Sequence, residues 1–233
     1  MKKEIIVINL GGSQIIVNNE INVDFLLKFK SIINKYSNKY KFIIVCGGGS
    51  FARVYINSLK KVGASEKLQS LTGISITRHN ARFMSYFFGF DNVNGIPYNY
   101  NNIKQVESML KKQDVIFCGA LEYHPNQTSD ATSAQIASYF KSIYINITNV
   151  SGLFDKDPTK FRNAKLIKTI SWRDFNKIAS KIKFIPGQHF VIDSKAANIM
   201  MKNKIKTYII GKDLKNLVNI LNNKNFNGTL ISD

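Results

Sequence analysis

The sequence has few cysteines and lacks a long apolar run. Its two cysteines, Cys46 and Cys118, each end an apolar segment, which is typical of small buried side chains and gives no disulfide framework. No run approaches the roughly 20 apolar residues that cross a bilayer, and the apolar part of the opening MKKEIIVINLGG is too short for a signal peptide. We therefore expect a cytoplasmic protein without a membrane partner.

Acidic residues are also scarce. The 233-residue chain carries 15 Asp and Glu against 33 Lys and Arg, a formal net charge of +18. Such an excess can serve nucleic-acid binding, but the lysines are scattered and no zinc-ligand spacing or aromatic RNA-recognition signature accompanies them. The joint abundance of Asn, Ile and Lys indicates a compositional bias. We expect no nucleic-acid partner, and at most a field that attracts small phosphate esters.

Short β-rich runs alternate with helix-length amphipathic stretches, a pattern that predicts an α/β fold with a mostly parallel sheet covered on both faces. The predicted strands are residues 4–10, 41–46, 115–118, 143–147, 166–171 and 207–210. The predicted helices are residues 24–36, 51–61, 76–88, 103–111, 131–140, 172–182, 194–201 and 214–221. We expect one compact unit with two lobes, residues 1–142 and 143–233.

Three polar or glycine-rich turns follow predicted strands. They are Gly11-Gly12-Ser13, Gly47-Gly48-Gly49-Ser50 and the hydroxyl-rich segment Tyr123 to Ser129. Ligands of open parallel sheets bind beyond the carboxyl ends of the strands, and glycines let backbone N–H groups approach an anion. Together the turns predict a phosphate-binding crevice, although each glycine turn alone could serve close packing only.

Two common nucleotide motifs do not explain these turns. Gly47, Gly49 and Ala52 fit G-x-G-x-x-A, but Glu66, at the distance of the ribose-binding acid, does not end a predicted strand. No glycine cluster is followed by the GK[ST] of a P-loop. A Rossmann fold and a P-loop fold are therefore disfavoured.

Some side chains near these turns could contact a nucleotide. Arg53 lies one turn into the helix that follows the triple glycine, from where its guanidinium could reach back to phosphates. In SGLFDKDP, residues 151–158, Phe154 could stack on a base and Lys156 could meet phosphates. Each also has a plain alternative. Arg53 could be a solvated arginine on the helix surface, and SGLFDKDP could be an Asp-Pro turn with a solvated lysine. Because no His, Cys, Asp or Glu cluster has metal-ligand spacing, we expect no dedicated metal site in the protein.

The combined motifs resemble those of the amino-acid kinase superfamily, and within it the uridylate kinases of the archaeal type. The motifs are INLGGS (8–13), VCGGGSFARVYI (45–56), GISITRHNA (73–81), HPNQTSDA (124–131), TNVSGLFDKDP (148–158), VIDSKAANIM (191–200) and NGTLI (227–231). The resemblance implies a three-layer α/β/α sandwich that transfers the γ-phosphoryl of ATP, with Mg²⁺, to UMP, giving UDP and ADP in pyrimidine nucleotide synthesis. It also implies that the lobe of residues 1–142 binds the acceptor UMP, that the lobe of residues 143–233 binds ATP, and that the chain self-associates as a homohexamer.

The resemblance implies a role for particular residues. Those expected to bind ATP are Gly12, Ser13, Gly49, Arg53, Thr148, Phe154 and Asp157. Those expected to bind UMP are Gly48, Ser70, Tyr123, His124, Pro125, Asn126, Gln127, Thr128 and Ser129. Asp130 matches the aspartate that organises the reacting groups, and Arg53 is the second expected catalytic residue.

Several residues depart from the family pattern. Asn9 stands where many members of the superfamily have a lysine, which archaeal uridylate kinases also tend to lack, and Ser70 stands where the archaeal enzymes usually have an aspartate that contacts UMP. Asn126 and Gln127 replace a glycine and a histidine, and Ser151 replaces an aspartate. A kinase for another small acid or phosphate acceptor, and a non-catalytic nucleotide-binding or storage protein, are therefore alternatives.

Overall fold

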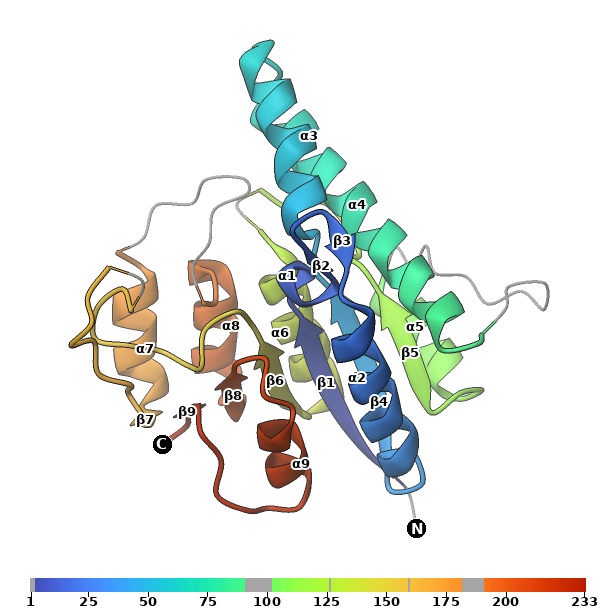
Figure 1. Cartoon of the computed structure of the whole chain (residues 1–233), viewed down its shortest axis with the longest axis vertical. Coiled ribbons are helices and arrows are strands. Elements are labelled where there is room, and N and C mark those ends of the chain that lie inside the picture. The colour runs from blue at the N-terminus through green and yellow to red at the C-terminus, as the bar shows by residue number, and fades with distance from the viewer. Residues whose placement is uncertain (1–2, 91–101, 126, 159, 182–190) are drawn as a thin grey trace.

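A seven-stranded sheet forms the centre of the protein (Figure 1). The computed structural model describes residues 3–90, 102–125, 127–158, 160–181 and 191–233. The strand order is β5-β4-β1-β6-β8-β9-β7, and neighbouring strands are parallel except for the β8–β9 pair. The strands are β1 (Glu4–Leu10), β4 (Tyr40–Cys46), β5 (Val115–Cys118), β6 (Ile143–Ile147), β7 (Thr169–Ile170), β8 (Thr207–Ile210) and β9 (Thr229–Ile231), and β2 (Ile16–Val17) and β3 (Glu20–Ile21) form a separate hairpin.

Helices cover both faces of the sheet, which confirms the predicted three-layer α/β/α sandwich (Figure 1). One face carries α2 (Val23–Tyr36), the end of α4 (Glu66–Phe87) and α9 (Lys215–Leu221). The other carries α5 (Ile103–Leu110), α6 (Ser129–Phe140), α7 (Trp172–Ala179) and α8 (Ser194–Asn203). The helices α1 (Gly12–Ile15) and α3 (Gly49–Lys61) follow β1 and β4 directly. Within the described residues, no helix is long and apolar enough to cross a membrane.

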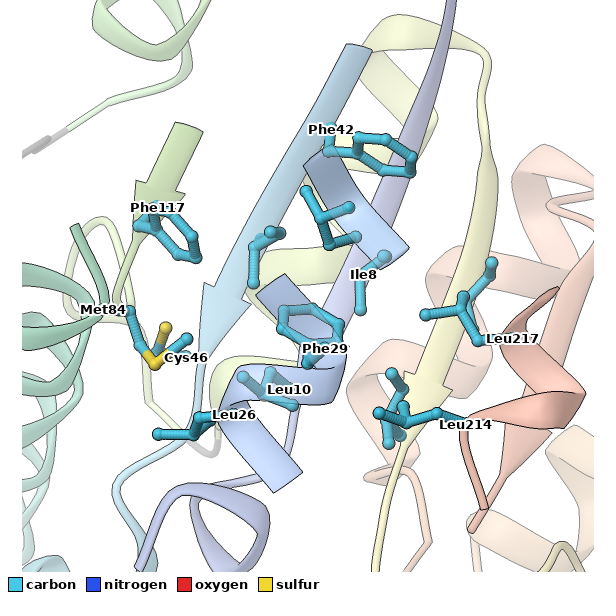
Figure 2. Packing of buried hydrophobic residues seen from close by; sticks show 14 of the residues in the cluster. Ile8, Leu10, Leu26, Phe29, Phe42, Cys46, Met84, Phe117, Leu214 and Leu217 are labelled. Atoms are coloured by element: carbon cyan, nitrogen blue, oxygen red, sulfur yellow. The ribbon is translucent and has the colours of Figure 1, made fainter. Parts of the chain in front are cut away.

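Alternation along the central strands produces two cores, because successive strand side chains point to opposite faces. In β1, Ile8 and Leu10 join the core beneath α2, whereas Val7 joins the core beneath α6 and α8. Figure 2 shows Leu26 and Phe29 of α2 over the first of these cores, beside Ile8, Leu10, Phe42 and Cys46 of the strands. The sheet is thus buried on both sides, and its carboxyl edge stays open to a ligand.

The helix predicted over residues 76–88 is longer in the structure, where α4 begins at Glu66. The Ser65 side chain accepts a hydrogen bond from the Leu68 N–H and thereby caps the helix. Gly73 and neighbouring β-branched residues lower the helix propensity of this stretch, and packing against α3 compensates: a Cβ on Gly73 would lie 3.4 Å from Ile56 Cδ1. Tertiary contacts therefore extend the helix beyond its local signal.

The strand predicted over residues 166–171 is shorter in the structure. Only Thr169–Ile170 form β7, while Leu166 makes an isolated bridge with Phe154. The short strands β2, β3 and β9 were not predicted, because two or three residues carry too little alternation to be recognised. Residue 182, which ends the helix predicted from residue 172, lies outside the described residues.

The predicted lobe boundary at residues 142 and 143 falls between α6 and β6. Since β1 pairs with both β4 and β6, one continuous sheet runs through both predicted lobes. The division into an acceptor lobe and an ATP lobe remains a prediction.

Candidate active site

A cleft opens at the carboxyl edge of the sheet, where the turns after β1 and β4 meet. Gly12 and Gly49 both border this cleft, together with Asn9 and Asn146 from the strand ends. In Figure 1, the start of α3 lies beside α1, above the ends of β1 and β4. The cleft therefore lies where ligands of parallel α/β sheets bind.

The two glycine turns touch through their backbones. A Cβ on Gly12 would lie 2.0 Å from the Gly49 nitrogen, and a Cβ on Gly47 would lie 2.6 Å from the Gly12 nitrogen. Gly49 also has a φ of +67°, in the left-handed region that favours glycine. Close packing thus requires glycine in these turns.

Helix N-termini converge on the cleft. The first residues of α1, α3 and α6 are Gly12, Gly49 and Ser129, and all three border the cleft. Free N–H groups and the positive end of the helix dipole favour an anion at such a place. Arg53, one turn into α3, borders the same cleft and adds a positive charge. The arrangement suits a ligand that carries several phosphates.

Asp130 lies in the first turn of α6 and borders the cleft. Its Oδ1 accepts a hydrogen bond of 2.7 Å from Nδ2 of Asn9, and its Oδ2 accepts one of 3.3 Å from the Asp193 N–H. Asn9 and Asn146 are neighbours in the β1–β6 pairing, and Nδ2 of Asn9 also donates to Oδ1 of Asn146 at 2.9 Å. The carboxylate is therefore held from both sides.

Burial, with a contribution from the nearby charge of Asp193, raises the pKa of Asp130 to about 8, against the opposing effect of its hydrogen bonds. The Asp130 side chain is partly exposed to the cleft, and water there moderates the effect. A cation or a phosphate-bound metal would favour the ionised form. The site thus holds a carboxyl group whose ionised form a positive ligand would favour.

Thr128 connects Asp130 to Asp193. The Thr128 hydroxyl donates to Oδ2 of Asp193 and accepts from the Asp130 N–H at 3.1 Å. Asp193 also caps α8, because its Oδ1 accepts from the Ala196 N–H at 2.7 Å. The starts of α6 and α8 are therefore joined through three side chains behind the cleft.

The structure brings most of the predicted site residues together. Those that border the cleft are Gly12, Ser13, Gly48, Gly49, Arg53, Ser70, Gln127, Thr128, Ser129, Asp130 and Thr148. Asn126 lies outside the described residues. The other predicted residues are described but lie outside the cleft: Tyr123, His124, Pro125, Phe154 and Asp157.

The residues outside the cleft have contacts of their own. The Lys67 ammonium lies 6.0 Å from the Tyr123 ring centroid, His124 Nε2 lies 3.3 Å from Glu122 Oε1, and the Pro125 carbonyl accepts from Lys195. In the loop after β6, the Asp157 carboxylate lies 3.9 Å from the Lys160 ammonium, and the backbone of Phe154 forms an isolated antiparallel β-bridge with Leu166. Their predicted roles would require a ligand that extends beyond the cleft, or a movement of these loops.

Sequence reasoning did not single out Thr77, Asn80, Asn146 or Asp193. Asn146 is 2% exposed and Asn80 is 3% exposed, so both are buried amides, which are retained in cores when they are hydrogen-bonded. A signal was available for Asn146, since a polar residue interrupts the apolar strand IYINI. In contrast, burial raises the pKa of both Cys46 and Cys118, which fits their prediction as buried apolar side chains.

The residues of the cleft fit a magnesium ion that arrives with a nucleotide. Within the described residues, no group of three or more His, Cys, Asp and Glu side chains could hold a metal ion. Mg²⁺ typically takes one or two carboxylates and completes its shell with water and substrate phosphates. Asp130 supplies such a carboxylate at the edge of a cleft suited to phosphates.

Comparison with known proteins agrees with this geometry. The sequence profile of the amino acid kinase family matches residues 4–211. The chain belongs to the amino acid kinase family, as its sequence motifs predicted.

Within this family, the chain is similar to archaeal uridylate kinases. It is 34% identical to the uridylate kinase of Pyrococcus abyssi over 221 residues, covering 94% of this chain and 96% of the relative. It is 31% identical to that of Thermococcus kodakarensis over 228 residues, covering 97% and 98%. The crystal structure of uridylate kinase from Archaeoglobus fulgidus superposes with a TM-score of 0.78 at 31% identity, covering 97% of this chain and 99% of that one.

Proposed function

We propose that this protein is a uridylate kinase, which transfers the γ-phosphoryl group of ATP to UMP and releases UDP and ADP. The observation that supports it most is the convergence of two glycine turns, three helix N-termini, Arg53 and Asp130 on one cleft. Full-length similarity to uridylate kinases supports UMP as the acceptor. The cleft supports the binding of phosphates, and the relatives support the reaction and its acceptor.

In this proposal, a phosphate oxygen of UMP attacks the γ-phosphorus of ATP while the bond to the β-phosphate oxygen breaks. The acceptor oxygen is already an anion, so the reaction needs no strong general base, and catalysis consists of alignment and charge neutralisation. The backbone N–H groups of Gly12 and Gly49, and the guanidinium of Arg53, would neutralise the phosphate chain. Gly48 would receive the UMP phosphate.

Asp130 would orient the reacting groups from the start of α6. Mg²⁺, when bound with ATP, would neutralise charge on the phosphates, with Asp130 as its contact in the protein. Asn9 and the Asp193 N–H hold the Asp130 carboxylate in place from behind. Ser13 would approach the ATP phosphates beside Gly12.

The remaining predicted residues complete the proposal. Thr148, Phe154 and Asp157 would hold the nucleoside of ATP on the loop after β6. Ser70 and the segment of residues 123–129 would form the UMP pocket. Ser70 and Gln127 border the cleft, and since both depart from the family pattern they are where another acceptor would be selected.

An ADP-release assay with Mg-ATP and a panel of UMP, CMP, carbamate and acetylglutamate tests the proposed function. We expect turnover with UMP well above the other acceptors. Turnover with another acceptor and none with UMP would identify a kinase of different specificity. Nucleotide binding without turnover on any acceptor would identify a binding or storage protein.

We also propose that the chain assembles as a homohexamer. Four apolar side chains on α3, α4 and the turn between them are largely exposed: Val54 (58%), Tyr55 (56%), Val62 (78%) and Leu68 (53%). These helices project beyond the sheet (Figure 1), and exposed apolar patches mark association surfaces. Light scattering after size exclusion tests the proposal, with an expected mass six times that of the 26.4 kDa chain.

A further inference from the structure

One turn of α4 contacts both the triple-glycine turn and the segment that follows β5. Thr77 and Asn80 are buried at 7% and 3% exposure, and Arg78 between them is partly buried. Their polar atoms reach toward loops that border the cleft rather than toward solvent. This turn of α4 therefore contacts two walls of the cleft that lie far apart in the sequence.

Thr77 holds the first residues after β5. Its hydroxyl donates to the Ile74 carbonyl at 2.7 Å and accepts from the Ala120 N–H at 2.9 Å. Since a hydroxyl has one proton and that proton is committed to Ile74, its lone pairs remain for Ala120. The segment after β5 packs closely against α4 at Gly119. A Cβ there would lie 2.7 Å from the Thr77 hydroxyl oxygen and 2.5 Å from the backbone nitrogen of Arg78.

Arg78 holds the next two peptide units. Its Nε donates to the Ala120 carbonyl at 3.0 Å, and one of its terminal nitrogens donates to the Leu121 carbonyl. The rigid fork of an arginine can grip two successive carbonyls, which the single ammonium of a lysine cannot reproduce. Ala120 and Leu121 are 6% and 3% exposed, so the segment starts buried against α4 before it reaches the cleft.

Asn80 holds the triple-glycine turn. Its Nδ2 donates to the Gly47 carbonyl at 2.7 Å and to the Gly48 carbonyl at 3.4 Å. Because each peptide unit is planar and trans, its N–H points away from its carbonyl. With both carbonyls turned toward α4, the N–H groups of Gly48 and Gly49 are turned away from that helix. Asn80 thus sets the direction of the donors that the proposed phosphate site uses.

We propose that Thr77, Arg78 and Asn80 are positioning residues that fix the acceptor wall of the cleft. They act through the backbone of Gly47, Gly48, Ala120 and Leu121, and their side chains need not touch a substrate. The proposal rests on the proposed function for its kinetic consequence only. Its structural consequence, a rigid segment over residues 119–122, holds for any acceptor.

Amide hydrogen exchange of the ligand-free protein tests the structural consequence. In Thr77→Val, which removes the acceptor but keeps the shape, we expect the Ala120 amide to exchange about tenfold faster, the effect of losing one hydrogen bond. Thr77→Ser keeps the hydroxyl and should restore the protection. His79 is an exposed residue of the same turn. His79→Ala is therefore the matched control and should leave the amide exchange of residues 119–122 unchanged.

Steady-state kinetics with Mg-ATP and UMP tests the functional consequence. Arg78→Lys, which acts on Ala120 and Leu121, should raise the KM for UMP about tenfold, while the KM for ATP changes less than twofold. Equal increases in both KM values, or faster exchange over the whole chain without a local effect, would overturn the proposal. If the unmodified protein does not phosphorylate UMP, the proposed function fails and the exchange experiment still decides the positioning role. If Thr77→Val does not fold, the exchange of residues 119–122 in Arg78→Lys decides it.

Discussion

The amide of Asn9 donates a 2.7 Å hydrogen bond to the carboxylate of Asp130, joining the end of β1 to the start of α6. Asn9 is 3% exposed, and its other contacts are with Asn146 and the Ser133 hydroxyl. A lysine, usual at this position in the superfamily, would bring a positive charge to the cleft. Asn9 brings a neutral donor, so we expect the charge for phosphate binding to come from Arg53, Lys156 or a metal with the nucleotide.

Replacing Asn9 with leucine should destabilise the protein by about 2–4 kcal/mol, because Asn146 and Asp130 would lose a donor while remaining buried or partly buried. Urea unfolding of the variant measures the loss. Asn203→Leu, at an exposed position of α8, is the control and should change the free energy of unfolding by less than about 0.5 kcal/mol. Similar losses in the two variants would show that the buried network contributes nothing specific.

Asp130→Asn should lower kcat for UMP phosphorylation by roughly 100-fold or more, since the charge that orients the reacting groups is lost. The affinity for ATP should change much less, and isothermal titration measures it separately. Asp24→Asn is the matched control, because Asp24 also lies in the first turn of a helix but is exposed. Equal losses of turnover and affinity would contradict an orienting role for Asp130.

The ligand-free protein should lose stability as the pH rises through the range in which Asp130 ionises. An acid whose pKa is raised to about 8 in the folded state, but is ordinary when unfolded, stabilises the fold fully at low pH. That contribution is lost as the pH rises from about 4 to 8. Asp130→Asn removes this dependence, and we expect it to raise the melting temperature by roughly 5 °C at pH 8.5.

Thermal unfolding at pH 5 and pH 8.5 tests this, and the gain from Asp130→Asn should be much smaller at pH 5. The variant keeps an oxygen for the hydrogen bond from Asn9 but loses the oxygen that accepts from the Asp193 N–H, and this loss is the same at both pH values. A gain that is the same at both pH values would exclude ionisation of Asp130 as its cause. A larger gain at pH 8.5 would show that Asp130 is a functional group retained at the expense of stability.

Gly49→Ala should destabilise the protein far more than Gly63→Ala, although both glycines have similar positive φ angles of +67° and +72°. A Cβ at Gly63 would meet nothing within 4 Å, whereas one at Gly49 would lie 2.8 Å from the Gly12 carbonyl oxygen. We expect about 1–2 kcal/mol for Gly63→Ala, the cost of the left-handed backbone alone. Gly49→Ala should exceed 3 kcal/mol or prevent folding, measured by chemical unfolding and by the yield of folded protein. Equal costs would mean that the two glycine turns can move apart.

The sequence predicted the parts of the site that local patterns encode, namely the glycine turns after β1 and β4 and the start of α6. It did not predict the residues that act through distant partners. Asn80 of α4 reaches Gly47 in the turn after β4, and Asp193 reaches Asp130 from the start of α8. Such contacts depend on tertiary packing, which no local period records. The first half of α4 was missed for the same reason, since its support comes from α3.

Ser70→Asp tests the acceptor site directly. Ser70 borders the cleft from α4, where uridylate kinases of the archaeal type usually have an aspartate that contacts UMP. If Ser70 faces the ribose, a carboxylate there accepts hydrogen bonds from its hydroxyls, and we expect the KM for UMP to fall about tenfold. The KM for 2′-deoxy-UMP should fall much less, because one hydroxyl is missing. Ser75→Asp, on an exposed face of the same helix, should change neither value. A rise in KM for both acceptors would place Ser70 beside the phosphate, where a second negative charge repels the substrate.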